Sequence, residues 1–482
     1  MSVLGIDLGT SSVKVVVLGR DGRVLAQASG RYDVVRARPG WAETEPEDWW
    51  RATGEALARV PTDDVAAVGL SGQMHGVVLA AADGTPTRPA VLWADARAEP
   101  QLARYRDLPD DVRARLANPL SPGMAGPVLA WLHAHEPDAV TRAQSALQPK
   151  DWLRARLTGA VAAEPSDASA TLLYDALRQD WDDVVIEALG IRRDLLPRIL
   201  PTAATVAGAT TAGTPVVAGA ADTAAAALGA GLTRPGTVQL TIGTGVQLVT
   251  PVPAPTEADL TTDPTTHLYR SATDDGWYAM AAGLSGGQTL DWVRRLLGLD
   301  WPALYATAAR GPRAGDPVFL PHLVGERTPY LDTRMRGAWA GLDARHDREA
   351  LAWAALEGVA FGVADAHDAL RDAAPATRTA TEIRLAGGGS VAPAWRQLLA
   401  DVLGTPLRPV EVPDASARGA ALLAARAAGL DDELDGRLDG QDQPHRGTLV
   451  EPRSTAVAGR RALYRDTLHA LQPLRFAPDS SP

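Results

Sequence analysis

The stretch Asp7-Leu8-Gly9-Thr10-Ser11-Ser12 separates two largely apolar runs, Val3–Ile6 and Val13–Leu18. Apolar runs on either side of a glycine and hydroxyl residues predict a strand, a tight turn and a second strand. Glycine lets the backbone approach a ligand closely, and free N–H groups and hydroxyls suit phosphate oxygens. Asp7 is a candidate metal ligand beside this turn, either directly or through water. An ordinary β-hairpin without a ligand is the alternative.

A second stretch of the same kind, Ile242-Gly243-Thr244-Gly245, lies in the second half of the chain. It is flanked by the strand-like runs Thr237–Thr241 and Val246–Thr250. The recurrence predicts two related halves, each of which offers one turn to a nucleotide.

Size and composition indicate a two-domain globular protein. A single core stops growing near ~250–300 residues, so a chain of 482 residues predicts two domains. Acidic residues outnumber basic ones by 58 to 47, and the net charge of −11 argues against a nucleic-acid partner. The absence of Cys excludes disulfides, thiolate metal sites and a cysteine nucleophile. The sequence has no leader-like start and no apolar run of ~18 residues, so we expect a cytoplasmic protein without a membrane span.

Strand and helix signals alternate in both halves, which predicts an α/β protein with mixed sheets. Helices are expected over Pro46–Val60, Thr223–Ala230, Gly286–Leu297, Arg348–Ala373, Pro393–Leu403 and Ala415–Ala428. We place the domain boundary at Gly231, which gives domains 1–231 and 232–482, the second with a C-terminal helix over Ala456–Leu471.

Asp222 follows a strand predicted over Thr214–Ala218 and precedes a helix. The junction between a strand end and a helix start is where ligands collect in α/β proteins. Asp222 is therefore a candidate general base. The alternative is a helix N-cap that satisfies its own amides.

A second turn after a strand, Ser71–Gly76, contains Gln73, Met74 and His75. The amide of Gln73 and the ring nitrogens of His75 suit a polyol ligand, although a single His is more often structural. A third turn contains Trp93, which could stack on a sugar face, and Asp95. Asp95 could accept from sugar hydroxyls or form an ion pair with Arg97.

Two further segments carry charged residues or glycines. Glu326 and Arg327 follow an apolar run, and we expect an ion pair between them that ties this segment, the alternative being a ligand contact. Gly387-Gly388-Gly389-Ser390 lies between a strand and a helix and resembles a nucleotide-binding loop, or else forms a plain tight turn. The chain lacks the P-loop, nucleophile-elbow and His-Glu-x-x-His motifs, which argues against P-loop nucleotidases and hydrolases.

Taken in order, these motifs resemble the FGGY family of carbohydrate kinases. The resemblance spans Val3 to about Gly429 and rests on Asp7–Ser11, Gln73–Gly76, Gly219–Asp222, Gly243-Thr244, Gly387–Gly389 and Trp395-Arg396-Gln397. It implies an actin/hexokinase-type ATPase fold: two ribonuclease-H-like domains, each with a mixed sheet, and an interdomain cleft. The loop Met74-His75-Gly76, with Lys150-Asp151-Trp152 and Ser166–Ser169, is most similar to family members that phosphorylate D-xylulose.

The resemblance also implies a role for each candidate residue. Asp222 would be the general base, and Asp7 would help to hold Mg²⁺. ATP would be bound by Thr10, Ser11, Ser12, Gly243, Thr244, Gly387, Gly388 and Gly389. The sugar pocket would be lined by Gln73, Met74, His75, Trp93 and Asp222.

The implied reaction is transfer of a phosphoryl group from ATP to D-xylulose. Gly245-Val246 after Thr244, and the alanines on both sides of Asp95, depart from the family pattern and leave the sugar preference open. One alternative is an FGGY kinase of another ketose or polyol, such as D-ribulose or a tetritol. Another is a non-catalytic, nucleotide-switched protein of the same fold.

The expected partners are a sugar and ATP, with neither nucleic acid nor membrane. Homodimers are common in such kinases, but the sequence carries no interface signal.

Overall fold

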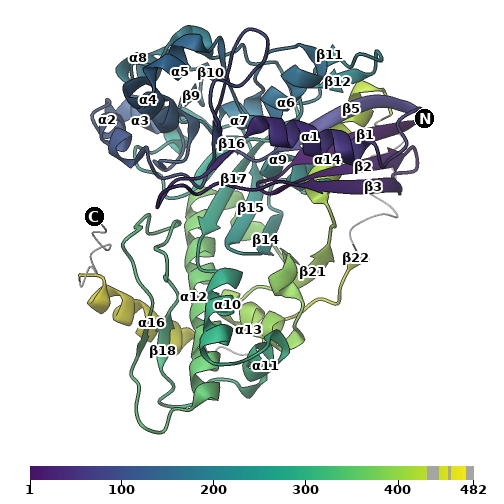
Figure 1. Ribbon diagram of the computed structural model, residues 1–482. Coiled ribbons are helices and arrows are strands. Elements are labelled where there is room, and N and C mark those ends of the chain that lie inside the picture. The colour runs from purple at the N-terminus through teal and green to yellow at the C-terminus, as the bar shows by residue number, and fades with distance from the viewer. Residues whose placement is uncertain (431–444, 454–456, 474–482) are drawn as a thin grey trace.

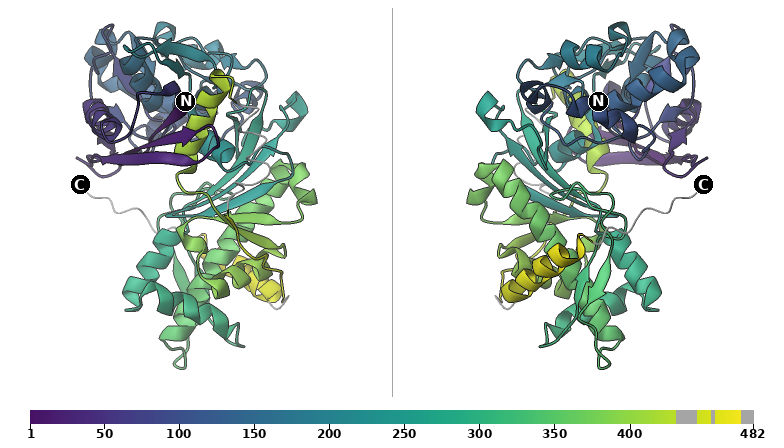
Figure 2. Two further views of the ribbon diagram at one scale, coloured as in Figure 1. Left: turned by 90° about the vertical axis from the view of Figure 1, so that its right-hand side faces the viewer. Right: turned by 90° about the vertical axis from the view of Figure 1, so that its left-hand side faces the viewer.

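The computed structural model describes residues 1–430, 445–453 and 457–473. It has two lobes, each built on a mixed β-sheet (Figures 1 and 2). The N-terminal half of the chain forms the upper lobe of Figure 1, and most of the later residues form the lower lobe. No helix within these described ranges combines the length and the apolar character needed to cross a bilayer.

The sheet of the first lobe has the strand order β11-β12-β5-β1-β2-β3, and a short strand, β13, pairs with β5. The strands are β1 (Ser2–Leu8), β2 (Ser12–Gly19), β3 (Val24–Arg31), β5 (Val65–Gly72), β11 (Val206–Ala209), β12 (Pro215–Val217) and β13 (Ala220–Ala221). β1, β2 and β3 are antiparallel neighbours, whereas β5 and β12 add in parallel on the other side of β1.

The sheet of the second lobe has the order β16-β17-β15-β14-β20-β21-β22. Its strands are β14 (Val238–Ile242), β15 (Val246–Val252), β16 (His267–Arg270), β17 (Trp277–Gly283), β20 (Ile383–Ala386), β21 (Leu407–Glu411) and β22 (His445–Arg446). β14, β15 and β17 are antiparallel neighbours, and β20 and β21 add in parallel beyond β14. The two sheets therefore share one plan, which confirms the prediction of two related halves.

Helices and short strands connect and cover the two sheets. Those of the first half are α1 (Pro46–Leu57), α2 (Leu102–Arg106), α3 (Asp110–Arg115), α4 (Ala125–His135), α5 (Pro137–Arg142), α6 (Pro149–Thr158), α7 (Pro165–Ala168), α8 (Asp183–Ala188), α9 (Asp222–Gly229), β4 (Glu43–Thr44), β6 (Val78–Ala80), β7 (Ala90–Val91), β8 (Ser145–Leu147), β9 (Tyr174–Asp175) and β10 (Asp180–Trp181). Those of the second half are α10 (Gly287–Leu296), α11 (Trp301–Ala306), α12 (Arg348–Ala373), α13 (Pro393–Leu403), α14 (Ala415–Ala427), α16 (Val457–Leu471), β18 (Val318–Leu320) and β19 (Ala338–Ala340).

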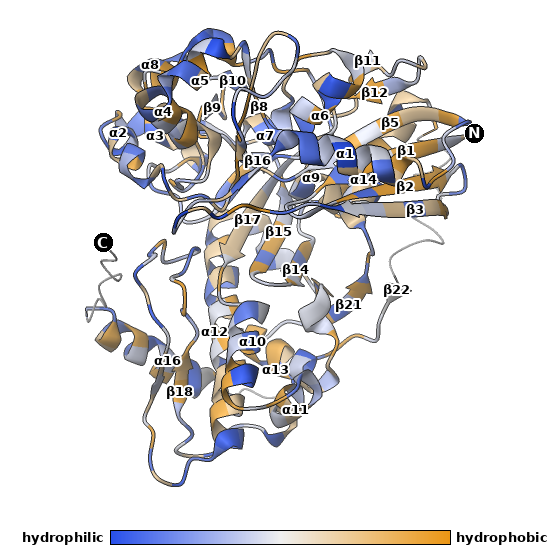
Figure 3. Ribbon diagram, viewed as in Figure 1, coloured by the Kyte–Doolittle hydropathy of each residue, from blue (hydrophilic) through white to orange (hydrophobic). Residues whose placement is uncertain are grey.

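Both faces of the first sheet are buried. Val13, Val15 and Val17 of β2 pack into one apolar core, while Val16 and Leu18 pack into another on the opposite face. Alternate residues of a strand point to opposite faces, so a nearly continuous apolar strand is the expected sequence for a sheet covered on both sides. Figure 3 shows this hydrophobic character along β1 and β2, in contrast with the blue, hydrophilic residues of α1.

Helix α14 belongs to the second half of the sequence but packs on the first sheet (Figure 2). Its side chains, among them Ala417, Ala421 and Leu423, join the core of the first lobe. The approach requires glycine, because a Cβ at Gly69 of β5 would lie 1.8 Å from the carbonyl oxygen of Ala420. The chain therefore returns to the first lobe after β21, and this return links the two lobes beside Asp222, whose carbonyl oxygen accepts from Ser416 Oγ at 3.2 Å.

Candidate active site

The two glycine turns occupy equivalent places in the two sheets. In the β1–β2 turn, Gly9 N donates to Ser12 O at 3.0 Å, and in the β14–β15 turn Gly243 N donates to Gly245 O at 3.0 Å. Both are β-hairpins, as the sequence predicted. Ser11, Gly243 and Thr244 are exposed and Thr10 and Ser12 are partly exposed, so their polar groups are accessible to a ligand.

A pocket of about 920 Å³ lies in the second lobe, beside the β14–β15 turn. Its lining combines Gly243, Thr244, Gly287, Gln288, Asp291, Trp301, Tyr305, Gly388, Gly389 and the first residues of α13. Trp301 and Tyr305 are stacked, with ring centroids 5.5 Å apart, and offer an aromatic wall. Mostly apolar pockets of this size with a few polar groups at one end are typical of small-molecule sites.

The three glycines after β20, Gly387 to Gly389, differ in their surroundings. Gly388 and Gly389 line the pocket, and a Cβ at Gly388 would meet open space. Gly387 is not among the lining residues; it has a φ of 92°, and a Cβ there would lie 2.4 Å from Ile242 O. Gly387 and Gly389 are thus both required by the close approach of Ile242 of β14, since a Cβ at Gly389 would lie 2.5 Å from Ile242 Cγ2, whereas Gly388 leaves room for a ligand.

Asp222 is the first residue of α9 and lies at the junction of the two lobes. Its Oδ1 accepts from Thr223 N at 2.6 Å and from Thr223 Oγ1 at 3.1 Å. Its Oδ2 has no hydrogen-bond partner among the described residues, so local capping uses only half of the carboxylate. Burial raises the pKa of Asp222 to about 6, which makes it a better proton acceptor than an ordinary aspartate.

Asp7 lies at the end of β1, close enough to Asp222 for their charges to interact. Burial raises the pKa of Asp7 to about 7, and the neighbouring charge of Asp222 acts in the same direction. Asp7 Oδ1 is buried and has no hydrogen-bond partner within the described part of the chain. An unpartnered carboxylate oxygen of raised pKa is a site where a cation would be stabilised.

The Ser71–Gly76 turn places three predicted residues beside the β1–β2 turn. Gln73 Nε2 donates to Gly9 O at 3.3 Å, and Gln73 Oε1 is buried without a partner. Met74 is buried, and His75 adopts a φ of 70°. His75 Nδ1 lies 2.7 Å from Ala170 O, and burial lowers the His75 pKa to about 4, so the ring is neutral at pH 7. The Nδ1–H then donates to the carbonyl, and Nε2 is left as an acceptor.

Trp93 lies between this group and the first glycine turn. Its Nε1 donates to Thr10 Oγ1 at 3.0 Å, and the side chain is 36 % exposed, which leaves ring surface available for a ligand. Asp95 does not join it. Its carboxylate accepts from Ala42 N and from Arg97 Nε and Nη2 at 2.6–2.9 Å, so of the two alternatives the ion pair is the one formed.

β16 and the loop after β18 bring further residues to this place: Tyr269 and His267, which the sequence analysis missed, and Arg327, for which it gave a ligand contact as the alternative. Tyr269 lies 6.2 Å from His75 between ring centroids, and its hydroxyl lies 2.7 Å from His267 Nδ1. The guanidinium of Arg327 lies 5.7 Å from the ring centroid of Trp93. No local motif marks Tyr269 or His267, since Tyr269 meets His75 and His267 meets Asn118 through contacts between distant parts of the chain.

The predicted ion pair between Glu326 and Arg327 is wrong: none of the ion pairs between described residues joins them. Glu326 instead accepts from Leu284 N at 2.6 Å and lies 3.2 Å from His322 Nδ1. Glu326 forms an isolated antiparallel β-bridge with Asp332, so the backbone is extended here. Side chains of adjacent residues in an extended segment point in opposite directions. Arg327 therefore faces away from Glu326, toward the first lobe.

A buried ionic network supports the strand that leads to Asp222. Lys150 Nζ lies 2.7 Å from Asp151 Oδ1 and 3.0 Å from both Glu164 Oε1 and Asp167 Oδ2, and all four side chains are almost fully buried. Glu164 accepts from Ser166 Oγ at 2.8 Å, and Ser166 Oγ in turn accepts from Ala221 N at 2.9 Å. The network thus reaches the residue that precedes Asp222.

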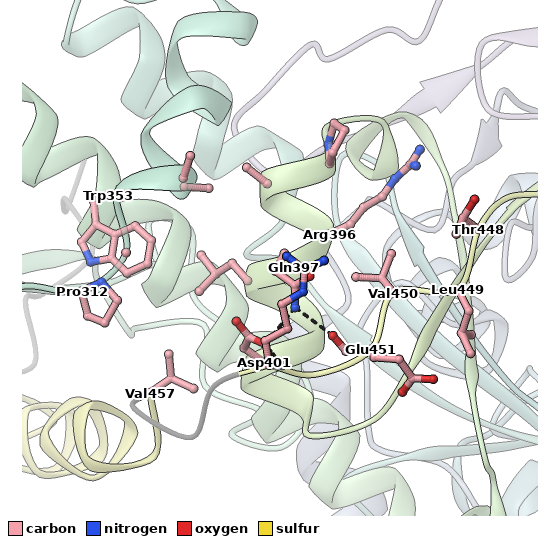
Figure 4. A pocket seen from close by; sticks show the side chains of 17 residues that line it. Pro312, Trp353, Arg396, Gln397, Asp401, Thr448, Leu449, Val450, Glu451 and Val457 are labelled. Atoms are coloured by element: carbon pink, nitrogen blue, oxygen red, sulfur yellow. Dashed lines mark hydrogen bonds between the residues drawn. The ribbon is translucent and has the colours of Figure 1, made fainter.

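A separate cavity of about 870 Å³ lies beside α13 and contains none of the predicted site residues (Figure 4). Its polar groups bond to each other: Gln397 Nε2 donates to Asp401 Oδ1 at 3.0 Å and to Glu451 O at 2.9 Å. These hydrogen bonds hold the segment around Glu451 against α13, so we assign the polar residues of this cavity a structural role.

Comparison with known proteins identifies the family of this fold and site. Residues 2–229 match the N-terminal domain of the FGGY family of carbohydrate kinases, and residues 238–428 match its C-terminal domain. The chain is 36 % identical to a xylulose kinase of Escherichia coli over 98 % of this chain and 99 % of that protein. It is 33 % identical to a xylulose kinase of Bacillus subtilis, over 90 % and 89 % of the two chains.

Solved structures give the same result. A crystal structure of a "xyloylose kinase" from Brucella ovis is 32 % identical, with a TM-score of 0.88 over 98 % of this chain and 99 % of that one. A xylulose kinase structure from Rhodospirillum rubrum is 26 % identical, with a TM-score of 0.86 over 98 % and 99 %. Two domain matches that together cover most of the chain, and relatives of this similarity, establish that the protein belongs to the FGGY family of carbohydrate kinases.

Proposed function

We propose that this carbohydrate kinase transfers the γ-phosphoryl group of ATP to D-xylulose and forms D-xylulose 5-phosphate. The observation that carries the proposal is the half-satisfied carboxylate of Asp222, whose pKa is raised to about 6 and whose charge reaches Tyr269, the ring that lies 6.2 Å from the neutral His75. The relatives that match nearly the whole chain are named xylulose kinases, which supports the choice of sugar.

Phosphoryl transfer requires alignment and charge stabilisation more than covalent chemistry by the protein. In the proposed mechanism, Asp222 Oδ2 accepts a hydrogen bond from the terminal hydroxyl of the sugar and takes its proton as that oxygen attacks phosphorus. The opposite end of the sugar lies toward His75, where Nε2 accepts from a hydroxyl. Trp93 covers one face of the sugar and limits the access of water, which otherwise competes as the acceptor.

The nucleotide is proposed to bind in the second-lobe pocket. Its adenosine lies against Gly388, Gly389 and the aromatic wall of Trp301 and Tyr305. The phosphates then extend past Gly243 and Thr244 toward Thr10, Ser11 and Ser12 of the facing turn. Both turns offer backbone N–H groups and hydroxyls, which are suitable donors for phosphate oxygens.

Asp7 is proposed to hold Mg²⁺. The buried, unpartnered Asp7 Oδ1 fits this ion, since Mg²⁺ is usually bound through one or two carboxylates together with substrate phosphates and water. When bound, the ion would neutralise charge on the transferring phosphate.

Replacement of Asp7 by asparagine is expected to raise the Mg²⁺ concentration needed for half-maximal turnover by ~10–100-fold, the range typical for loss of a group that supports a metal. The measurement is a Mg²⁺ titration of ADP release at saturating sugar. Asp21→Asn is the matched control, since Asp21 is 43 % exposed in its salt bridge with Arg23, in the turn after β2. An unchanged Mg²⁺ midpoint for Asp7→Asn would remove Asp7 from the proposed metal site.

The test of the proposed function is sugar-stimulated ATP consumption. We expect ADP release to rise strongly when D-xylulose is added and to rise much less with D-ribulose or a tetritol. Stronger stimulation by one of the other sugars would assign the enzyme to that acceptor. Indifference to every sugar would instead support a non-catalytic, nucleotide-switched protein.

A further inference from the structure

Arg327 crosses from the second lobe to the first. Both sequence neighbours of Arg327 are held by hydrogen bonds: Leu284 N donates to the Glu326 carboxylate, and Thr328 N donates to Ala282 O at 3.0 Å. Thr328 Oγ1 also donates to Thr265 O at 2.8 Å. The backbone around Arg327 is therefore held to β17 and its surroundings, and the side chain is directed at Trp93.

The guanidinium of Arg327 has no hydrogen-bond acceptor or carboxylate partner among the residues that the structure describes. Arginines of this chain whose side chains are well buried are paired, as Arg97 is with Asp95 and Arg310 with Asp316, whereas Arg327 is half-buried. Burial lowers the pKa of Arg327, and the charges of Tyr269 and Glu326 oppose this only in part. A cation that is partly withdrawn from water is normally paired or hydrogen-bonded, so the half-buried guanidinium of Arg327 can take an acceptor from a ligand.

The groups that face Arg327 are neutral and polar or aromatic. His75 and His267 are held uncharged by burial, which lowers the pKa of His75 to about 4 and that of His267 well below its ordinary value. The positive charge of Arg327 acts in the same direction on both. Tyr269 lies beside them, and its hydroxyl is occupied by His267 at 2.7 Å. No carboxylate of the described residues competes for the guanidinium on this side.

Arg327 lies at the His75 end of the site and away from the reacting carboxylate. Its charge affects the pKa values of His75, His267 and Tyr269, and Tyr269 also responds to the charge of Asp222, so Tyr269 lies between the two, whereas the pKa of Asp222 is set by burial and by Thr223. A sugar whose terminal hydroxyl contacts Asp222 and whose face covers Trp93 would bring its other end to Arg327. In a 2-ketose that end carries a carbonyl oxygen, which only accepts hydrogen bonds, and a guanidinium only donates them.

We propose that Arg327 is a specificity-determining residue that donates hydrogen bonds to the C2 carbonyl oxygen and the neighbouring hydroxyl of a ketose. This inference rests on the proposed function and assigns the residue that separates ketoses from polyols. Because Arg327 comes from the second lobe, sugar bound in the first lobe also strengthens contact between the lobes. Sites built to bond a polar substrate group discriminate strongly against analogues that lack it.

The test is Arg327→Met, which keeps an apolar stem over Trp93 but removes the donors. We expect the KM for D-xylulose to rise by about 10–100-fold, the range for loss of a hydrogen bond to a charged group. The KM for ATP should stay within about twofold. The preference for D-xylulose over xylitol and D-arabinitol, which differ from it by reduction at C2, should fall by a similar factor. Arg327→Lys, which retains a charged donor, should restore part of this preference.

Arg334→Met is the matched control, because Arg334 is on the same loop but is 47 % exposed and paired with Asp332. It should leave both KM values unchanged. An Arg327→Met enzyme with wild-type KM and wild-type sugar preference would overturn the inference, as would an equal rise in KM for ketose and polyols. A wild-type enzyme that no sugar stimulates would overturn the proposed function instead, so the two failures are distinguishable.

Discussion

Replacement of Asp222 by asparagine is expected to lower kcat by about 10²–10⁴-fold, the usual contribution of a positioned general base. Asparagine keeps the size of the side chain and can still accept from Thr223, so the start of α9 should remain intact. The loss should therefore appear in kcat while the melting temperature and the KM for ATP change little. The measurement is steady-state ADP release at saturating sugar and ATP, with a thermal melt of the same preparation.

The pH profile provides an independent check on the same carboxylate. Burial raises the Asp222 pKa to about 6, so below pH 6 the group is protonated and cannot accept the hydroxyl proton. The kcat/KM of the wild-type enzyme for the sugar should rise with pH through about 6 and then level off. Asp194→Asn is the control, since Asp194 is 69 % exposed in its salt bridge with Arg192. Near-normal turnover of Asp222→Asn would show that Asp222 is not the base.

Replacement of Lys150 by methionine is expected to reduce the free energy of unfolding by about 3–5 kcal/mol, the range for removing one partner of a buried ion pair. Lys150 is the cation shared by Asp151, Glu164 and Asp167, and no water reaches these side chains to replace it. Burial raises the pKa of Asp167 well above its ordinary value, even though the charge of Lys150 opposes this. Loss of Lys150 should leave Glu164 and Asp167 buried without a cation, while Asp151 keeps its ion pair with Arg154 at 2.6 Å. Chemical denaturation measures the difference.

Arg51→Met is the control for Lys150→Met, because Arg51 makes ion pairs with Asp48 and Glu55 at the surface. Exposed pairs contribute ~0–1 kcal/mol, so this variant should unfold almost like the wild type. A second replacement, Asp167→Asn in the Lys150→Met background, should recover part of the loss by removing one unpaired acid. Equal denaturation midpoints for Lys150→Met and the wild type would contradict the assigned role of the network.

Elements with strong local signals were predictable from the sequence. Helix α12 spans Arg348–Ala373 as predicted, and its N-cap is Asp347, whose side chain accepts from Ala350 N at 2.9 Å. Helix α13 begins with Pro393 and ends at Gly404 in the left-handed conformation. Capping residues, proline and glycine act within one helical turn, so their effects can be recognised in a short stretch of sequence.

Features that depend on distant contacts were not predictable in the same way. The sequence predicts α14 as a helix, but its place on the first sheet depends on Gly69 meeting Ala420 and on Gly419 meeting Ala225. Likewise, the sequence analysis favoured an ion pair for Arg327 and kept a ligand contact as the alternative, and the choice depends on Trp93, which lies beside Arg327 only in the folded chain. In both cases the two contacting residues are far apart in the chain, and the local sequence around one does not identify the other.

The residues of the candidate site also differ in whether local sequence was enough to predict them. Asp7 lies at the end of a strand, His75 and Asp222 follow strands, and all three could be selected from their local sequence; their roles in the site stay predictions. Gly387 was predicted together with its neighbours to bind nucleotide. Its positive φ and its close contact with Ile242 explain on conformational grounds alone why this position is glycine. Gly388 and Gly389 line the pocket, and Gly389, like Gly387, also has to be glycine because Ile242 lies too close for a Cβ.

The most direct test of the central claim is a panel of sugars assayed by ADP release with the wild-type enzyme. The panel contains D-xylulose, D-ribulose, a tetritol, xylitol and a blank without sugar, each with ATP and Mg²⁺. The account predicts that D-xylulose gives the highest kcat/KM and that the blank gives little ADP. A higher kcat/KM for another sugar, or ADP release that no sugar increases, would contradict it.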